Sequence, residues 1–355
     1  MLRHVYLEIT NLCNRNCSFC PGTEREKGFL PPERFLGRIR KIRSYADVIH
    51  LHVLGEPLLH PSFPEMIRLC AAESFPVEVT TNGTLLTPEN RRALLSETVR
   101  QVNFSLHSLH PEEESILDEI LVFAGSAMKE RPGLFLNFRL WNSGGNAADT
   151  WIRRKIRSAF GLPETLLAQD PSRHSRRLLN RLYLNQGPLF EWPGRLSSSV
   201  ASPALLSAGG GAESPEEAQA EEKRQSESFK TGEETGKNAG MECRGSCYGL
   251  ISQFAVLLDG TVTPCCLDSE GAVLLGNLDA EAELGIILSS PRARALRDGF
   301  LHGRIAEPFC RECRYRERFS KGFQRRNRNR RKEKAFSSAV FQAPSGSCPG
   351  SAIPY

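Results

Sequence analysis

Three cysteines near the start of the chain have the types and spacing of metal ligands. The stretch "NLCNRNCSFC", residues 11–20, places Cys13, Cys17 and Cys20 in a C-x3-C-x2-C pattern. Thiolates are soft ligands that suit zinc or iron–sulfur clusters. A structural zinc ion takes four protein ligands, whereas a cubane 4Fe–4S cluster held by three cysteines keeps one iron open for another ligand. The triplet therefore favours an iron–sulfur cluster that can do chemistry at its open iron.

The composition of the chain limits the classes of protein to which it can belong. At 355 residues, 40% hydrophobic and 25% charged, it resembles an ordinary globular protein with room for a large domain and a smaller one. The N-terminus, "MLRHVYLEIT", lacks the apolar core of a signal peptide, and no apolar run approaches the roughly 18 residues of a membrane span. We therefore expect a cytoplasmic protein without a membrane segment. Disulfides are rare in that compartment, so the eleven cysteines indicate metal binding or catalysis.

The positive charge of the chain is concentrated near its C-terminus. Residues 321–334, "KGFQRRNRNRRKEK", hold eight basic residues and one acidic residue, which is more than the whole net charge of +5. The rest of the chain therefore offers no bulk electrostatic attraction for nucleic acid. Any affinity for RNA or DNA would lie in this basic tail.

Short β-rich runs alternate with helix-like stretches in the first half of the chain. The expected strands are residues 5–10, 48–53, 77–81, 101–106, 134–140 and 181–185. The expected helices include residues 32–43, 62–73 and 87–98. The last of these begins with Thr87 as N-cap and Pro88 in the first turn. This alternation predicts a parallel sheet or barrel whose chemistry lies in loops at the C-terminal ends of the strands, and the cysteine triplet follows the first strand.

The triplet, with Phe19 directly before its last cysteine, resembles the motif of the radical S-adenosylmethionine (radical SAM) enzymes. The resemblance implies an α/β fold, a partial (β/α)6 barrel similar to a TIM barrel. It implies that Cys13, Cys17 and Cys20 hold a 4Fe–4S cluster whose fourth iron is chelated by the amine and carboxylate of S-adenosylmethionine. Reductive cleavage of the sulfonium would then give a 5′-deoxyadenosyl radical that abstracts hydrogen from a substrate.

Further segments match the family in the expected order. "LGEP", residues 54–57, resembles the GGEP motif that binds the amino group of S-adenosylmethionine, with Leu54 in place of the first glycine. "TTNG", residues 80–83, ends the third expected strand. "FSLHS" and "FRLWN" follow at the fourth and fifth strands. The resemblance implies cofactor contacts from Phe19, Gly55, Glu56, Pro57, Ser105 and Arg139. No tight ligand set is formed by the spacing of the histidines His50, His52, His60, His107 and His110.

A second set of cysteines lies in the C-terminal part of the chain. Between Cys247 and Asp268 the residues Asp259-Gly260 separate two β-rich runs, which predicts a hairpin. This segment, with "CREC" at 310–313, resembles the SPASM or twitch extension of radical SAM enzymes, which carries auxiliary clusters. One auxiliary 4Fe–4S cluster is implied, with ligands Cys247, Cys265, Cys310 and Cys313. The alternatives are Cys266 or Cys243 as a ligand, and a zinc site made by the same thiolates.

Four segments follow from these patterns: a barrel at 1–192, a disordered linker at 193–242, an auxiliary cluster domain at 243–319 and a disordered basic tail at 320–355. The linker composition is rich in Ser, Gly and Glu and cannot bury enough apolar surface to fold. The resemblance implies an enzyme acting on a peptide, a protein or a cofactor precursor, with electrons from a flavodoxin or ferredoxin. The alternatives are a radical enzyme acting on nucleic acid and a non-catalytic zinc-binding protein.

Overall fold

The computed structural model describes residues 2–141, 147–167, 174–187, 192–193 and 244–319. Apart from Pro193, the predicted linker lies outside the described residues. The basic tail, Cys243 and Cys348 lie outside them as well. Within the described part of the chain, no helix is both long enough and apolar enough to cross a membrane.

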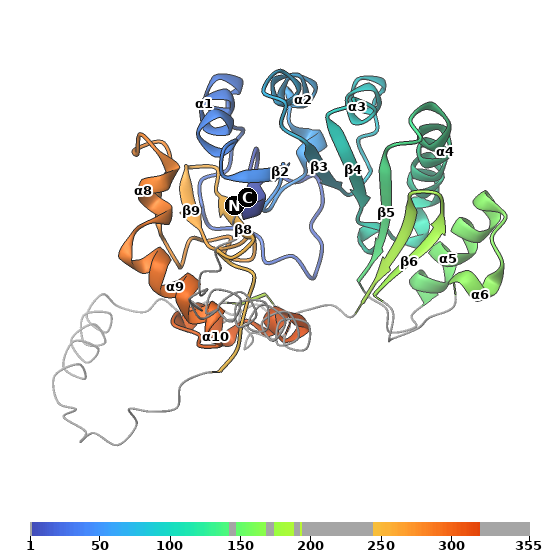
Figure 1. Cartoon of the computed structure of the whole chain (residues 1–355). Coiled ribbons are helices and arrows are strands. Elements are labelled where there is room, and N and C mark those ends of the chain that lie inside the picture. The colour runs from blue at the N-terminus through green and yellow to red at the C-terminus, as the bar shows by residue number, and fades with distance from the viewer. Residues whose placement is uncertain (1, 142–146, 168–173, 188–191, 194–243, 320–355) are drawn as a thin grey trace, which may run out of the picture.

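Six parallel strands form the wall of a partial (β/α)6 barrel (Figure 1). They are β1 (Leu2–Leu7), β2 (Ala46–His50), β3 (Val77–Thr81), β4 (Val99–Phe104), β5 (Phe135–Leu140) and β7 (Leu182–Gln186). They lie side by side in chain order, as repeated right-handed crossovers through helices require. The predicted alternation of strands and helices and the predicted fold class are confirmed.

Helices cover the outer face of this sheet (Figure 1). They are α1 (Pro32–Ile42), α2 (Phe63–Ala72), α3 (Pro88–Leu94), α4 (Glu114–Glu130), α5 (Ala147–Phe160) and the short α6 (Glu164–Leu167). Helix α1 shows why: Phe35, Ile39 and Ile42 recur at helical spacing and are fully buried. Helix α3 begins as predicted, since the Thr87 hydroxyl accepts the Asn90 N–H at 3.2 Å.

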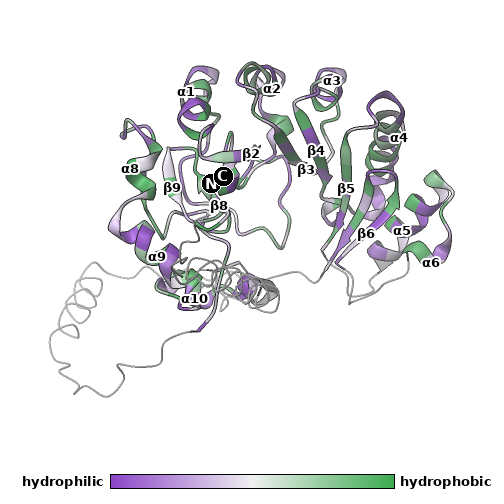
Figure 2. Ribbon diagram, in the orientation of Figure 1, coloured by the Kyte–Doolittle hydropathy of each residue, from purple (hydrophilic) through white to green (hydrophobic). Residues whose placement is uncertain are grey.

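The strands alternate apolar and polar side chains between their two faces. Val5, Leu7, Leu136 and Phe138 belong to the continuous apolar core, which accounts for the hydrophobic strands in Figure 2. The intervening residues point to the opposite face, because successive strand side chains alternate. That face bears the polar residues Tyr6, His50, Glu78, Asn103, Asn137 and Arg139.

The C-terminal unit (residues 244–319) continues the same sheet. Strands β8 (Gln253–Val256) and β9 (Thr261–Thr263) form the predicted hairpin, and β10 (Gly276–Asn277) pairs with β9. Strand β8 pairs in parallel with β1, so the hairpin extends the barrel wall. Helices α8 (Leu284–Leu288), α9 (Pro291–Leu301) and α10 (Pro308–Glu312) follow. This direct pairing between two distant parts of the chain was not predicted.

The opposite edge of the sheet ends in an additional antiparallel strand, β6 (Ser175–Leu179). The sequence analysis did not predict it, because the run "SRRLL" has two adjacent arginines and no clear alternation of apolar and polar residues.

Candidate functional site

The first cysteines lie in a loop that its own side chains close. This cysteine loop (residues 11–28) follows β1. The Asn11 amide donates to the Glu26 carbonyl at 2.8 Å, and its oxygen accepts the Gly28 N–H at 3.0 Å. One asparagine thus ties the two ends of the loop together. The loop stands at the C-terminal end of the first strand, where chemistry is expected in such a barrel.

The three predicted ligands in this loop are free thiols. Cys13 is exposed, and Cys17 and Cys20 are half-buried. They are close enough to interact electrostatically, and partial burial raises the pKa of Cys13 and of Cys17. Arg15 donates a hydrogen bond to Cys17 and is held by Glu113 at 2.7 Å. The loop therefore presents a cation beside a set of thiols, which suits thiolate ligands of a metal cluster.

The LGEP loop (residues 54–57) packs directly on the cysteine loop. A Cβ atom at Gly55 would lie 2.4 Å from the Thr10 carbonyl oxygen, and Gly55 has φ +76°. Both the space and the backbone conformation require glycine. The Glu56 N–H donates to the Leu12 carbonyl at 2.9 Å. The two sequence motifs are thus joined through their main chains.

Glu56 is fully enclosed and hydrogen-bonded to the TTNG segment. Its Oε1 atom accepts the Thr81 hydroxyl at 2.7 Å and the Leu58 N–H at 3.0 Å, and its Oε2 atom accepts the Asn82 N–H at 2.7 Å. Burial raises the pKa of Glu56 to about 6. A carboxylate offers about four acceptor positions, and these three donors leave one for a ligand cation.

Of the other predicted cofactor residues, Phe19 lies in the cysteine loop, Ser105 directly follows β4, and Arg139 lies on β5. Ser105 follows β4, and its hydroxyl forms no hydrogen bond within the described residues. The ring of Phe19 lies 4.9 Å from that of His107, which stacks on Trp141 at 5.5 Å. The Arg139 guanidinium lies 5.2 Å from the Trp141 ring. The structure therefore links Phe19 to Arg139 through two aromatic rings, and leaves a free hydroxyl on Ser105.

The C-terminal unit brings its four predicted ligands together. Each of them interacts electrostatically with at least one other: Cys247, Cys265, Cys310 and Cys313. Burial raises the pKa of the first three. Cys266 also interacts electrostatically with Cys247 and Cys265, and it forms a hydrogen bond with Tyr6 and lies near Arg139, which brings its thiol to the barrel interior as well. Cys265 interacts with two other predicted ligands, Cys247 and Cys310, as the predicted set requires.

A polar cluster inside the barrel was not identified from the sequence, although several of its histidines were noted. His4 Nδ1 lies 3.0 Å from His50 Nε2, and the Tyr6 ring stacks on His50 at 4.4 Å. Glu78 lies 3.7 Å from His50. Burial lowers the pKa of His52 to about 3, so this imidazole is neutral. The sequence did contain a signal for this cluster, because polar residues recur at every second position of several strands.

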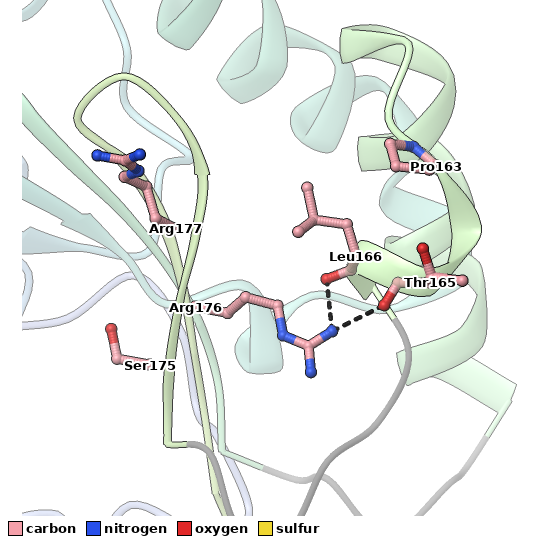
Figure 3. A pocket seen from close by; sticks show the side chains of 6 residues that line it. All are labelled: Pro163, Thr165, Leu166, Ser175, Arg176 and Arg177. Atoms are coloured by element: carbon pink, nitrogen blue, oxygen red, sulfur yellow. Dashed lines mark hydrogen bonds between the residues drawn. The ribbon is translucent and has the colours of Figure 1, made fainter.

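The cavity between α6 and β6 is separate from these cysteines (Figure 3). It has a volume of about 500 Å³, and Arg176 crosses it to donate to the carbonyls of Thr165 and Leu166 at 2.9 Å. Strand β6 is the edge of the sheet opposite β10, whereas the cysteines gather around β1 and β8. The cavity therefore does not belong to the candidate site.

The donor sets fit iron–sulfur clusters. No three His, Cys, Asp or Glu side chains of the described ranges converge tightly enough to hold a metal ion. A cubane needs wider spacing than a single zinc ion, since each thiolate binds a different iron. All the cysteines involved are free thiols. Three thiols stand on an accessible loop and four are gathered in the C-terminal unit, as an open and a closed cluster require.

Two family models match the chain in the regions just described. Residues 7–125 match the radical SAM superfamily, and residues 247–314 match SPASM, an iron–sulfur cluster-binding domain. The first range spans the cysteine loop, the LGEP loop and Ser105. The second spans all four cysteines of the C-terminal unit. The zinc alternative receives no support from these matches.

Curated relatives align over the first part of the chain. The tungsten-containing aldehyde ferredoxin oxidoreductase cofactor-modifying protein of Pyrococcus furiosus is 32% identical over 128 residues, covering 35% of this chain and 36% of the relative. A GTP 3′,8-cyclase of Aquifex aeolicus is 32% identical over 125 residues, covering 33% and 38%. The aligned region thus spans less than two fifths of the length of these relatives.

Solved structures share the fold of nearly the whole chain. SuiB of Streptococcus suis bound to S-adenosylmethionine has a TM-score of 0.53 at 13% identity, covering 88% of this chain and 71% of SuiB. SuiB bound to the precursor peptide SuiA has a TM-score of 0.52 at 12% identity, covering 88% and 70%. At this identity the likeness concerns the fold. The two family matches, at residues 7–125 and 247–314, show that the chain belongs to the radical SAM superfamily and carries a C-terminal SPASM domain.

Proposed function

We propose that the chain is a radical SAM enzyme that cleaves S-adenosylmethionine and modifies a peptide, a protein or a cofactor precursor. Membership of the superfamily brings 4Fe–4S clusters and S-adenosylmethionine as cofactors. The observation that carries the proposal is the meeting of three free thiols with the LGEP loop at the end of β1. When bound, these cofactors supply a 5′-deoxyadenosyl radical that abstracts hydrogen from the substrate.

The residues of the chain have distinct roles in this proposal. Cys13, Cys17 and Cys20 hold the cluster. Glu56 has one acceptor position left and accepts the ammonium group of S-adenosylmethionine, while the Ser105 hydroxyl binds another polar group of the ligand. Further contacts come from Gly55, Pro57, Phe19 and Arg139.

Arg139 is suited to the methionyl carboxylate. Its guanidinium lies among Tyr6, Glu78 and Cys266, and burial lowers the pKa of Arg139. A buried cation is stabilised by an anionic ligand, and an arginine donates two parallel hydrogen bonds to a carboxylate.

The substrate proposal follows from the relatives. SuiB, which shares the fold of this chain, is solved in complex with a precursor peptide, and the Pyrococcus relative is named a cofactor-modifying protein. We assign the four cysteines of the C-terminal unit to one auxiliary 4Fe–4S cluster. A flavodoxin or ferredoxin would reduce the enzyme in the cytoplasm, where thiols stay reduced.

An anaerobic reconstitution tests the proposal. The full chain is loaded with iron and sulfide, reduced with dithionite and incubated with S-adenosylmethionine. The expected result is about eight irons per chain, as two cubanes require, and slow release of 5′-deoxyadenosine without substrate. Zinc without iron, or iron without any 5′-deoxyadenosine, would contradict the proposal.

A further inference from the structure

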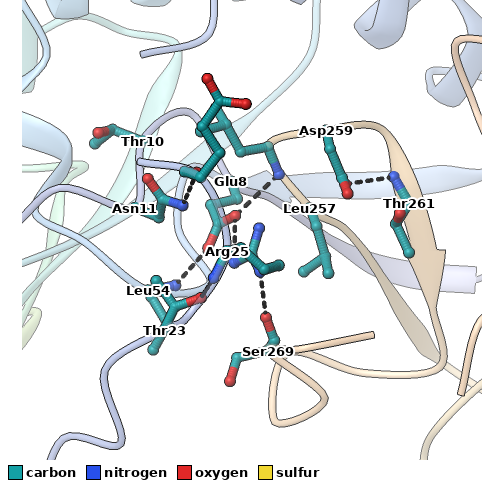
Figure 4. Close-up of polar contacts among 12 residues, drawn as sticks. Glu8, Thr10, Asn11, Thr23, Arg25, Leu54, Leu257, Asp259, Thr261 and Ser269 are labelled. Carbon is teal, nitrogen blue, oxygen red and sulfur yellow. Dashed lines mark hydrogen bonds and ion pairs between the residues drawn. The ribbon is translucent and has the colours of Figure 1, made fainter. Parts of the chain in front are cut away.

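One buried ion pair lies where three segments of the chain meet. Glu8, directly after β1, is fully buried, and the Arg25 guanidinium of the cysteine loop lies 2.8 Å from its carboxylate (Figure 4). The Leu54 N–H donates to Oε1 at 3.2 Å, and the Leu258 N–H donates to Oε2 at 2.9 Å. One carboxylate thus binds a donor from the cysteine loop, one from the LGEP loop and one from the C-terminal unit.

Arg25 extends the junction toward the auxiliary cysteines. Its Nε atom donates to the Ser269 carbonyl at 2.7 Å (Figure 4). Ser269 lies three residues after Cys266, in the loop that follows the adjacent cysteines Cys265 and Cys266. The Arg25 side chain is therefore held on one side by Glu8 and on the other by the C-terminal unit. Its position depends on both.

We propose that Glu8 is a positioning residue that holds the LGEP loop ready for S-adenosylmethionine when the C-terminal unit is docked; this inference rests on the function proposed above. The LGEP loop is fixed at two main-chain points. Leu54 N–H is bound by Glu8, and Glu56 N–H is bound by the Leu12 carbonyl at 2.9 Å. Gly55 between them packs so closely on the cysteine loop that a Cβ atom there would lie 2.4 Å from the Thr10 carbonyl oxygen. We therefore expect a displacement at Leu54 to be transmitted along this short loop to Glu56.

A purely structural role would not need a charge at this place. A buried ion pair costs desolvation free energy, and apolar side chains of similar volume often stabilise a fold equally well. A carboxylate, however, can accept several donors from different segments at once. The contacts of Glu8 with Arg25, Leu54 and Leu258 use that capacity to fix three segments in one register.

Docking of the C-terminal unit has support that is independent of Glu8. Arg38 of α1 donates to the Leu257 carbonyl at 3.1 Å and to Asp279 at 2.6 Å. Lys41 donates to the carbonyls of Leu278 and Glu281. We therefore expect the unit to stay docked when Glu8 is changed, so that a loss of register can be measured in a folded protein.

The variant Glu8→Gln tests the inference. Glutamine keeps the volume but replaces one acceptor oxygen with an NH2 group, which leaves either the Leu54 or the Leu258 N–H opposite a donor. In the reconstituted holoenzyme we expect the dissociation constant of S-adenosylmethionine to rise about tenfold. Iron content stays unchanged, and amide hydrogen exchange accelerates in peptides covering residues 54–56. A role limited to stability would move the melting temperature but not this local exchange.

Two further variants complete the test. Glu119→Gln removes the same charge from an exposed ion pair with Arg91 and should leave affinity and exchange unchanged. Arg25→Lys keeps a cation opposite Glu8 but cannot also donate to Ser269, so the dissociation constant should rise less, about threefold. The Arg25→Lys variant keeps the inference testable if Glu8→Gln does not fold.

Specific outcomes would overturn the inference. They are an affinity of Glu8→Gln within about twofold of the wild type, or faster exchange near Leu258 with none at residues 54–56. Unchanged affinity in both the Glu8→Gln and the Arg25→Lys variant would do the same. A wild-type protein that binds no S-adenosylmethionine would contradict the proposed function instead, and the exchange measurement would still test the positioning of the loop.

Discussion

The two cysteine sets differ in exposure and in number. The set in the cysteine loop has three thiols, of which Cys13 is exposed, and Arg15 donates to Cys17 beside it. The C-terminal set has four thiols packed against a short helix and a hairpin, and Cys310 is buried. The first set thus includes an exposed thiol, whereas the second includes a buried one, and the other cysteines of both sets are half-buried.

This difference separates two roles for iron–sulfur clusters. A cluster held by three ligands keeps one iron open for another ligand, and we propose that the LGEP loop and Ser105 would bind that ligand. A closed set with four ligands has no such position, so we expect it to support folding and electron transfer. The predictions below test this division, beginning with the largest effect.

The largest contrast is expected between Cys17→Ala and Cys310→Ala. We expect Cys17→Ala to lower the rate of 5′-deoxyadenosine release by more than the roughly 10–100-fold typical of changes around a metal ligand. Cys310→Ala should keep release measurable but lower the melting temperature, because metal binding is coupled to folding. Iron analysis and chromatography of 5′-deoxyadenosine measure both effects in each variant.

Cys70 provides the matched control. It is a fully buried thiol of α2, and burial raises the pKa of Cys70, as expected for a core residue outside both sets. Cys70→Ala should cost about 1 kcal/mol of stability from lost burial and retain all the iron. The division would be wrong if Cys310→Ala abolished release while Cys17→Ala retained it.

Removal of Arg38 should lower the stability of the fold without changing any cysteine ligand. Arg38 is fully buried and binds the Leu257 and Leu258 carbonyls and Asp279. Arg38→Met removes all three contacts: the Leu258 carbonyl loses its donor, whereas the Leu257 carbonyl keeps the Gly260 N–H and Asp279 keeps Arg34. The variant should lower the free energy of unfolding by about 3 kcal/mol. Urea denaturation measures this. The exposed Arg92 beside Glu89 is the control, since Arg92→Met should change stability by less than about 0.5 kcal/mol. Equal losses in the two variants would exclude a role for Arg38 in docking.

Local sequence patterns predicted the barrel and the grouping of the cysteines. Strand β3 has the predicted bounds 77–81, and Thr87 caps α3 as expected. Strand–helix alternation and capping depend on neighbouring residues, so a single sequence reveals them. The grouping of Cys13, Cys17 and Cys20 follows from their spacing along one loop in the same way.

Contacts between distant segments could not be predicted in this way. Glu8 and Leu258 are 250 residues apart, and no local pattern marks either as part of a junction. The pairing of β8 with β1 depends equally on tertiary packing. The sequence could not separate Cys265 from Cys266, because the two are adjacent and their spacings to every other cysteine differ by one position. The hydrogen bond of Cys266 with Tyr6 likewise joins distant segments.

A smaller effect is expected from Ser105, which distinguishes binding of S-adenosylmethionine from cleavage. Its hydroxyl is free of hydrogen bonds in the described structure, so Ser105→Ala should leave no unsatisfied protein partner. Loss of one ligand hydrogen bond should raise KM for S-adenosylmethionine about five- to tenfold with little change in kcat. Ser108→Ala is the control and should leave KM unchanged, because the Ser108 hydroxyl already donates to a protein group, the Ser105 carbonyl, at 2.7 Å. An unchanged KM in Ser105→Ala would remove Ser105 from the site.

The smallest expected effect is a pH dependence of S-adenosylmethionine binding, caused by Glu56 of the LGEP loop beside the three-cysteine set. Burial raises the pKa of Glu56 from 4.5 to about 6, so protonation between pH 7.5 and 5.5 removes the charge that binds an ammonium group. The dissociation constant of S-adenosylmethionine should therefore rise about fourfold over that range. The effect of Glu56 on stability has the opposite pH dependence. Because its pKa is higher in the folded protein, protonated Glu56 contributes about 2 kcal/mol to the free energy of unfolding below pH 4.5. This contribution is lost as the pH rises through about 6. In Glu56→Gln the affinity should be weaker and independent of pH. A variant that kept the pH dependence of the wild type would show that another group controls it.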